Sequence, residues 1–402
     1  MTQEHDHAAP ASPVPVPAAP ALPDAASTMC IANVEAFVFR APCAMPVRTA
    51  FGVMHDRPAV LVRVRDTDGV EGWGEVWCNF PGVGAEHRAR LLASVLAPML
   101  QGAQIAQPAQ ATAELERRTA ILAIQCGEPG PLAQVLAGVD QALWDLAARR
   151  ARLPLWRLLG GSSPTIGAYA SGLGPAGATQ AALAHQAMGY RAFKLKVGFN
   201  PQDDSDNLRA LRLALGDDAR LMVDANQGWS REQALQACPR LAESGLDWIE
   251  EPLRADAPQA HWREVATSTT VALAAGENIM GIDHFGQAIA SGQLGVLQPD
   301  VAKWGGISHC LPVAQMALAA GLRYCPHYLG AGVGLAMSAH LLAAAGGDGM
   351  LEVDSNPNPL REMLWPTLAG LRDGRISLGE EAGIGAPPEL GALEEFAVPF
   401  GY

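Results

Sequence analysis

The sequence predicts an α/β fold, in which a (β/α)8 TIM-like barrel follows an N-terminal α+β capping domain. Eight short apolar runs alternate with seven amphipathic stretches over about 190 residues. A charged or polar side chain stands at or near the end of seven of these runs. A doubly wound sheet also alternates, but it rarely has eight near-equal units, and no GxGxxG motif follows the first strand. The expected strands are 166–170, 192–197, 220–224, 246–250, 271–276, 295–299, 322–326 and 349–353.

The segment ahead of the barrel has a few strands followed by helices, which is typical of an α+β domain. Residues 31–40 and 59–65 are rich in Val, Ile and Phe and predict strands. A loop is expected over 41–58, which holds Pro, Gly, Met and His. The segments 85–125 and 131–159 have helical spacing. In the second, the apolar stripe is Leu136, Val139, Leu143, Leu146 and Ala147.

The chain divides into four predicted parts. They are a disordered Pro/Ala-rich tail over 1–28, the capping domain over 29–155, the catalytic barrel over 156–370, and a C-terminal segment over 371–402 that returns to the capping domain and carries a weak strand. Six prolines between Pro10 and Pro23 disfavour helix in the tail. His5 and His7 form an HxH there, but they precede any foldable segment and are not expected to bind a metal.

Composition restricts the compartment and the partners. No basic stretch followed by an apolar one opens the chain, and no run of ~18 apolar residues could span a membrane. Seven cysteines without a CxxC favour reduced thiols, so a cytoplasmic location is expected. Lys+Arg 28 against Asp+Glu 41 gives a net charge of −13, which argues against a nucleic-acid partner. A small carboxylate substrate fits, because a site can be locally cationic. We also expect a homo-oligomer.

Polar residues at the strand ends form the candidate site, since the chemistry of such barrels lies at the carboxyl ends of the strands. From the second strand to the eighth they recur 23 to 28 residues apart, about one βα unit. Any one of them could be an ordinary loop residue, but seven in succession favour a site. The residues are Lys194 and Lys196, Asp224, Glu250, Glu277, Asp300, His327 and Glu352.

The residue types suggest the chemistry. Asp224, Glu250 and Glu277 would come from adjacent strands, and three oxygen ligands without Cys or His suit Mg²⁺ better than zinc. Lys194 and Lys196 point to the same face of their strand. Like charge and a nearby metal are expected to lower the pKa of Lys196 so that it can act as a base.

The remaining lysine and the later strands complete this arrangement. Lys194 would neutralise a substrate carboxylate. Asp300 would fix the tautomer of His327 and raise its basicity. A base on each side of a metal-bound anion suits removal of a proton from the carbon next to a carboxylate. The metal and Glu352 would then stabilise the developing enediolate.

Seven short pieces of this sequence, in order, resemble the enolase superfamily and within it the mandelate racemase subgroup. They are AFKLKVG, LMVDANQGW, WIEEP, AAGENI, QPDVAKWGG, CPHY and LEVDSNPNPL. The resemblance implies a barrel with a capping domain, Mg²⁺ bound by the three carboxylates, and acid/base roles for Lys196 and for His327 paired with Asp300. Glu352 would be an electrophilic donor. Relatives of the muconate-lactonizing type carry a catalytic Lys where this chain has Asp300, three residues before Lys303, which is expected to be a structural turn residue.

The function expected is that of a lyase or an isomerase of this superfamily. Dehydration of an acid sugar or small hydroxy acid to a 2-keto acid is the first expectation. A racemase or epimerase using the same two bases is the alternative, and an inactive carboxylate-binding barrel is the alternative of another class. Arg48, His55 and Arg57, in the segment 41–58, are expected to form a lid that sets substrate preference.

Overall fold

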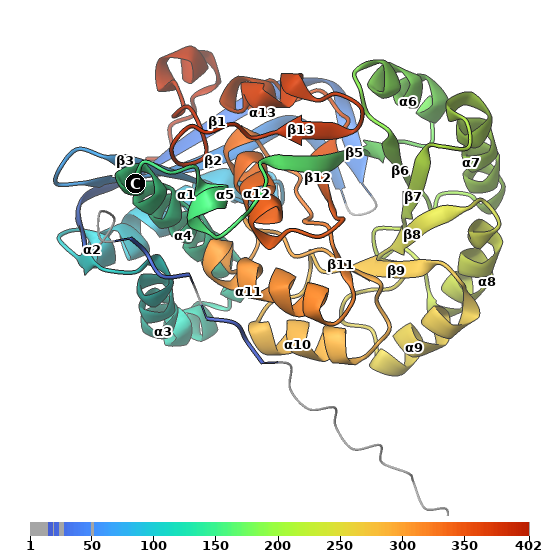
Figure 1. The fold of residues 1–402 in the computed structure, drawn as a ribbon, viewed down its shortest axis with the longest axis horizontal. Helices are drawn as coiled ribbons and strands as arrows, with labels where there is room; N and C mark the ends of the chain where they lie inside the picture. The colour runs from blue at the N-terminus through green and yellow to red at the C-terminus, as the bar shows by residue number, and fades with distance from the viewer. Residues whose placement is uncertain (1–14, 19, 24–27, 50–51, 402) are drawn as a thin grey trace, which may run out of the picture.

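The computed structural model describes residues 15–18, 20–23, 28–49 and 52–401 of the chain. The barrel lies beside an α+β domain, and this confirms the predicted fold class (Figure 1). Most of the tail over 1–28, including His5 and His7, lies outside the described residues. In the described part of the tail, the carbonyl oxygen of Pro20 accepts a hydrogen bond from Gln107 Nε2 of the capping domain at 3.0 Å. In the described part, no helix is long and apolar enough to cross a membrane.

The capping sheet has the strand order β3-β2-β1-β4. Its helices pack on one face, and the close approach of α4 to β3 depends on two glycines. A Cβ on Gly72 or Gly74 would collide with a carbonyl oxygen of α4. The bounds are β1 Met29–Thr49, β2 Gly52–Asp66, β3 Glu71–Val76, β4 Gln104–Ile105, α1 Gly84–Leu91, α2 Ala97–Leu100, α3 Pro108–Cys126, α4 Pro129–Ala151 and α5 Leu155–Leu158. The expected stripe on α4 is buried, whereas the helical stretch expected over 85–125 is interrupted by β4.

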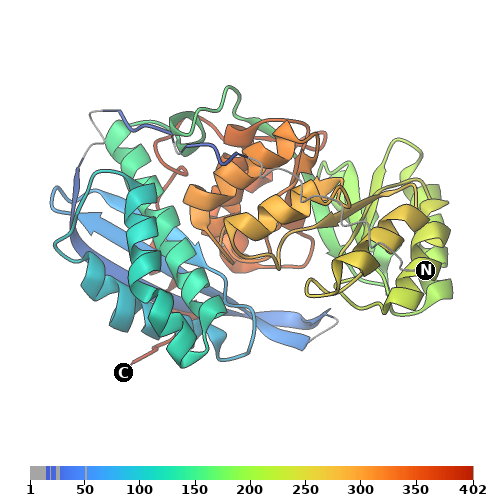
Figure 2. The same ribbon diagram turned by 90° about the horizontal axis from the view of Figure 1, so that it is seen from below.

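The prediction of a loop over 41–58 is wrong. β1 and β2 remain paired through this segment, with Ala41 opposite Arg57 and Val47 opposite Met54. The register shifts between Pro42 and Val47, so the prolines that suggested a loop fall beside an irregularity in the ladder, where they are tolerated. Figure 2 shows the resulting hairpin projecting from the capping sheet along the barrel.

The barrel strands are parallel, in the order β11-β10-β9-β8-β7-β6-β5-β12. The barrel is nearly closed between its end strands, where Met350 N–H donates to Cys325 Sγ at 3.4 Å. Every expected strand is confirmed. The strands are β5 Thr165–Leu173, β6 Ala192–Lys196, β7 Arg220–Asp224, β8 Leu246–Glu250, β9 Ala272–Ala275, β10 Val296–Leu297, β11 Arg323–Tyr324 and β12 Met350–Asp354. The helices are α6 Ala178–Ala187, α7 Pro201–Leu215, α8 Arg231–Ala242, α9 Gln259–Ser268, α10 Ile282–Ala290, α11 Gly306–Ala319 and α12 Gly332–Ala345.

The C-terminal segment touches both domains. After α13 (Pro359–Leu364), the weak strand is β13 (Arg375–Ser377), which pairs antiparallel with β5 of the barrel. The chain then reaches the capping sheet, where Val398 N–H donates to the carbonyl oxygen of Val38 at 2.9 Å.

Candidate active site

An apolar layer inside the barrel carries the polar rim. The cluster takes its side chains from all eight strands or their immediate ends: Tyr169, Ala192, Met222, Trp248, Ala274, Val296, Cys325 and Met350. Successive residues of a strand alternate faces, so the residue two positions later points inward one layer higher. That position holds Lys194, Asp224, Glu250, His327 and Glu352 after five of these eight residues. Strand phase therefore brings these five side chains to one end of the barrel.

Lys194 lies at the centre of this rim. Its side chain is fully buried, and Nζ lies 2.5 Å from Glu250 Oε1, 2.7 Å from Glu352 Oε1 and 3.7 Å from Asp224 Oδ2. Burial opposes the charged form, but the carboxylates of Glu250 and Glu352 outweigh it and raise the pKa of Lys194 well above its usual value. Lys194 is thus a fixed cation beside the carboxylates.

Lys196 is more exposed and contacts Asp224, with Nζ 2.6 Å from Oδ2. Its pKa is raised, because the charge of Asp224 outweighs both burial and the like charge of Lys194. The expectation of a lowered pKa included the effect of a nearby metal, and without one the contact with Asp224 outweighs the like charge of Lys194. The ammonium has a carboxylate partner at hydrogen-bond distance, which the spacing of the lysines did not indicate.

Asp300 and His327 form a pair just after the carboxyl ends of β10 and β11. His327 Nδ1 lies 2.6 Å from Asp300 Oδ2, and Nε2 lies 2.8 Å from Glu277 Oε2. Asp300 Oδ1 is held by the N–H groups of Ala302 at 2.7 Å and Lys303 at 3.1 Å. Burial would lower the pKa of His327, but the carboxylates of Glu277, Glu352 and Asp300 raise it well above its usual value. The imidazole is therefore held in its protonated form.

The three candidate metal ligands stand at the ends of β7, β8 and β9. Asp224 accepts from Asn226 N–H at 2.7 Å, Glu250 from Gln298 Nε2 at 2.6 Å, and Glu277 lies 3.2 Å from Lys303 Nζ. Each faces a cation of the chain, and among the described residues no three His, Cys, Asp or Glu side chains form a ready metal-binding group.

Their neighbourhood still fits a cation. Buried Glu251 has no hydrogen-bond partner for Oε2. Burial and the charges of Glu277 and Asp224 raise its pKa well above the usual value. Carboxyl groups crowd one another here, and the donors are all oxygens, which suits Mg²⁺.

Sequence reasoning missed several residues that hold the site. Ser171 Oγ lies 2.5 Å from Glu352 Oε1, and Asn278 Nδ2 donates to Glu251 at 2.8 Å. Lys303 lies in the turn after β10, as expected, and its side chain also contacts Glu277. Left-handed backbone follows β7 and β8, with φ of 46° at Asn226, 61° at Gln227 and 41° at Glu251. Such non-glycine conformations gather at functional sites, but they leave no signal in composition.

The lid residues differ in their surroundings. Arg57 is buried and forms an ion pair with Asp354, two residues after Glu352 on β12. His55 is exposed on the hairpin. The side chain of Arg48 lies outside the described part of the structure.

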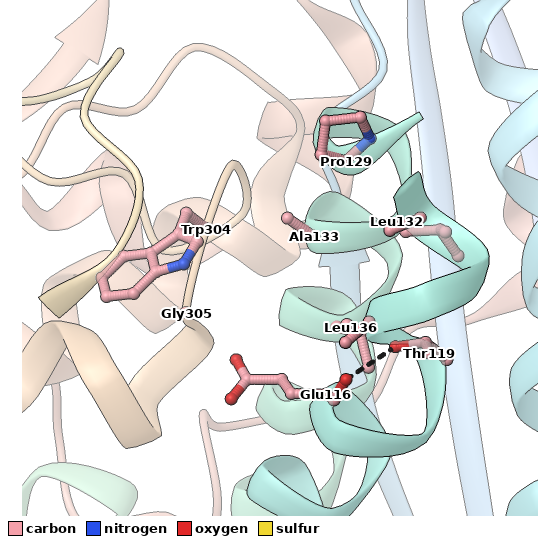
Figure 3. Close-up of a pocket in the computed structure, with 10 residues that line it drawn as sticks. Glu116, Thr119, Pro129, Leu132, Ala133, Leu136, Trp304 and Gly305 are labelled. Atoms are coloured by element: carbon pink, nitrogen blue, oxygen red, sulfur yellow. Dashed lines mark hydrogen bonds between the residues drawn. The ribbon is translucent and has the colours of Figure 1, made fainter. Parts of the chain in front are cut away.

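A cavity of about 170 Å³ lies away from this rim, between α3, α4 and the turn after β10. Figure 3 shows Trp304 and Gly305 facing Glu116 and the apolar residues of α4 across it. None of the candidate site residues lines this cavity.

A capped barrel with carboxylates, lysines and an Asp–His pair at its carboxyl rim defines an enzyme of the enolase superfamily. The family model described as "Enolase C-terminal domain-like" matches residues 177–390, and that of the "Mandelate racemase / muconate lactonizing enzyme, N-terminal domain" matches 33–160. The chain belongs to the mandelate racemase/muconate lactonizing enzyme family, as its motifs predicted.

The names of two curated relatives give an acid sugar or an acid-sugar lactone as the substrate. The chain is 31% identical over 359 residues to D-galactarolactone cycloisomerase of Agrobacterium fabrum, covering 85% of this chain and 92% of that protein. It is 34% identical over 266 residues to L-talarate/galactarate dehydratase of Salmonella typhimurium, covering 64% of each.

Two solved structures are also similar. A mandelate racemase/muconate lactonizing enzyme from Bordetella bronchiseptica RB50 has 56% identity and a TM-score of 0.88, covering 92% of this chain and 99% of that one. A racemase from Streptomyces coelicolor A3(2) with bound magnesium has 29% identity and a TM-score of 0.79, covering 92% and 100%.

Proposed function

We propose that this enzyme removes the proton α to a carboxylate through an enediolate, and that it dehydrates an acid sugar or small hydroxy acid to a 2-keto acid. The observation that carries the proposal is the presence of two acid/base groups at one rim, Lys196 and the Asp300–His327 pair, which we call the two acid/base arms. Lys196 lies at the end of β6, and the Asp300–His327 pair joins β10 and β11. A base and an acid thus reach the rim from separate strands, with Lys194 and Glu352 also present there.

The raised pKa of His327 supports an elimination, in which Lys196 must first lose to solvent the proton that its contact with Asp224 stabilises. Lys196 takes the α-proton, and His327, held as the imidazolium, gives a proton to the departing β-hydroxyl, which leaves as water. The enol that remains becomes the 2-keto acid. Lys194 balances the charge of the substrate carboxylate. Glu352 accepts from Ser171 and from Tyr328 N–H at 3.3 Å, and it must take up a proton before it can donate to the developing enediolate, because Lys194 and His327 outweigh burial and lower its pKa.

Asp224, Glu250 and Glu277 would hold Mg²⁺. When bound, the ion would polarise the substrate carboxylate, stabilise the enediolate charge and compete with Lys196 for Asp224. Bound magnesium in the similar Streptomyces racemase supports this assignment.

Racemisation or epimerisation of a 2-hydroxy acid is the second candidate, and the same two arms favour it. With one base on each side of the α-carbon, a proton taken by Lys196 is replaced by one from His327. The name of one curated relative, L-talarate/galactarate dehydratase, favours elimination. Because the rim holds the full set of candidate metal ligands and acid/base residues, an inactive binding barrel is the weakest alternative.

The reaction is tested by incubating the enzyme with Mg²⁺ and a library of acid sugars and hydroxy acids in D₂O. Formation of 2-keto acid is followed by semicarbazide absorbance, and deuterium at the α-carbon by NMR. If the enzyme is a dehydratase, at least one acid sugar or hydroxy acid in the library is expected to give a 2-keto acid. Deuterium uptake without keto acid identifies a racemase or epimerase. Neither product from any acid would refute α-proton abstraction.

The metal is tested separately, by calorimetric titration of the EDTA-treated protein with MgCl₂. Glu250→Gln is expected to weaken binding by at least about tenfold, because one charged oxygen ligand is lost. Glu352→Gln is the matched control, since this buried rim carboxylate is not a proposed ligand. The control should keep the metal and lose activity. Equal Mg²⁺ affinity of the wild type and Glu250→Gln would contradict the assignment.

A further inference from the structure

A carboxylate of the capping domain reaches the barrel loop that follows His327. Glu75 lies on β3 and is only 2% exposed. Its Oε1 accepts from Ala331 N–H at 2.6 Å and its Oε2 from Gly334 N–H at 2.9 Å. These N–H groups belong to the start of α12, where a negative charge is favoured by the helix dipole. Glu75 therefore caps a barrel helix from another domain.

The capped helix begins directly after the reactive segment. His327 and α12 are separated by residues 328–331 alone. Within this loop, Tyr328 N–H donates to Glu352 Oε2 at 3.3 Å. The Tyr328 hydroxyl lies beside Glu75, since a Cβ on Gly330 would collide with both groups. The loop held by Glu75 thus carries the imidazole and an N–H donor to Glu352.

The Asp300 half of the Asp–His pair is also held by the capping domain, through α4 and the residue after β3. Gln141 on α4 accepts from Glu75 N–H at 3.1 Å, and its Nε2 donates to the carbonyl oxygens of Glu75 at 3.0 Å and Val301 at 2.9 Å. Trp77 N–H donates to the carbonyl oxygen of Ala302 at 3.3 Å. Val301 and Ala302 directly follow Asp300, so Gln141 on α4 and Trp77, the residue after β3, hold the segment that carries Asp300, while Glu75 holds the loop after His327.

We propose that Glu75 is a positioning residue for the Asp300–His327 arm, so that the capping domain sets the geometry of one acid/base arm and leaves the Lys196 arm to the barrel. Glu75 touches neither the substrate site nor a proposed metal ligand in any described contact. Its effect passes through the α12 N-terminus and the 328–331 loop. The catalytic part of this inference depends on the proposed function, whereas the part that concerns the loop does not.

Asp145 provides a matched control. It lies on α4, is fully buried, and also accepts two backbone hydrogen bonds, from Trp73 at 2.9 Å and Ile384 at 2.8 Å. It holds β3 and the C-terminal segment, but none of its described partners lies in the loops after β10 or β11. Asp145 also pairs with Arg149 at 2.8 Å, so Asp145→Asn measures an upper limit for the general cost of loosening a buried carboxylate in this domain.

The first experiment is hydrogen–deuterium exchange of the full chain by mass spectrometry. Glu75→Gln keeps the shape of the side chain but turns an N–H group toward the N–H donors of α12. Exchange over 325–335 is expected to rise about tenfold while that over β6 to β8 changes less than about twofold. Asp145→Asn should leave 325–335 unchanged. Unchanged exchange over 325–335 in Glu75→Gln, or an equal rise over β6 to β8, would overturn the proposal.

The second experiment uses the substrate found in the D₂O screen. Glu75→Gln should lower kcat about 10- to 100-fold with KM changed less than about threefold, because the arm is displaced without loss of substrate contacts. α-Proton exchange through Lys196 should remain, and Glu75→Asp, which keeps the charge, should recover part of kcat. Equal losses in Glu75→Gln and Asp145→Asn would overturn the proposal.

If the wild type acts on no acid, the proposed function fails and the exchange result over 325–335 still decides the role of Glu75. Should Glu75→Gln not fold, Glu75→Asp takes its place in both comparisons, with smaller changes of the same kind expected.

Discussion

His327 is the residue on which the two candidate reactions differ most sharply. Its Nδ1 is held by Asp300 and its pKa is raised, so in the proposed dehydration it acts as the acid. His327→Asn is expected to lower dehydration about 10²- to 10⁴-fold, the usual loss for one general acid or base. α-Proton exchange with D₂O should continue through Lys196. Keto-acid formation and NMR of the recovered substrate measure the two rates together.

Lys196→Met is the reciprocal variant, and it should lose α-proton exchange and turnover alike in a dehydratase. In a racemase, each single variant should instead exchange only the enantiomer whose proton faces the surviving base. Wild-type turnover in His327→Asn would contradict the two-arm mechanism under either chemistry.

The hairpin of β1 and β2 is fastened to the barrel by a buried ion pair between Arg57 and Asp354. Removing one partner of such a pair leaves an uncompensated charge, so Arg57→Met is expected to lower the free energy of unfolding by about 3–5 kcal/mol. Because the hairpin lies over the barrel, substrate preference should change as well. Urea denaturation and the substrate screen measure the two effects.

His55→Ala is the control for this hairpin, since His55 is exposed and should leave stability within about 0.5 kcal/mol of the wild type. If Arg57→Met is as stable as His55→Ala and keeps the substrate profile, Arg57 does not anchor the lid.

The same hairpin shows what the sequence could predict and what it could not. Strand positions in the barrel followed from apolar runs and their spacing, and strand phase placed Lys194, Asp224 and Glu352 on one rim. Pro42 and Pro46 indicate a loop when only local sequence is considered. The hydrogen-bonded ladder that tolerates them depends on the partner strand, which is distant in sequence. Contacts between distant segments, such as Glu75 with α12, have no signature in local sequence at all.

α3 and α11 are joined by a titratable pair, with His309 Nε2 3.0 Å from Glu116 Oε1. Burial lowers the pKa of His309, but the hydrogen bond and charge of Glu116 outweigh it, so the pKa is raised. The stabilisation is therefore complete below the unfolded pKa of about 6.5 and is lost as pH rises through the folded value. His309→Gln is expected to lower stability by about 0.2–1 kcal/mol at pH 5.5 and by less at pH 9. Thermal unfolding at the two pH values tests this. A larger loss at pH 9 would contradict it.

At the scale of the whole molecule, the two domains are joined through α5, which is anchored to the barrel helix α12. Trp156 N–H donates to His340 Nδ1 at 3.1 Å. An imidazole that accepts this bond must be neutral at Nδ1, and its side chain is buried. Proton uptake by His340 would break the bond and place a charge between the domains.

Acid stability should therefore depend on His340. Burial, assisted by the charge of Arg149, lowers its pKa to about 3, below the unfolded value of about 6.5. The unfolded chain binds the proton first, so stability is intact above pH 6.5 and falls by up to ~1.4 kcal/mol per pH unit as pH drops toward 3. His340→Gln does not titrate, so it should be less stable at pH 7 but lose less between pH 6.5 and 5. Urea denaturation at these pH values compares the slopes, and equal slopes for both proteins would show that His340 is not the group responsible.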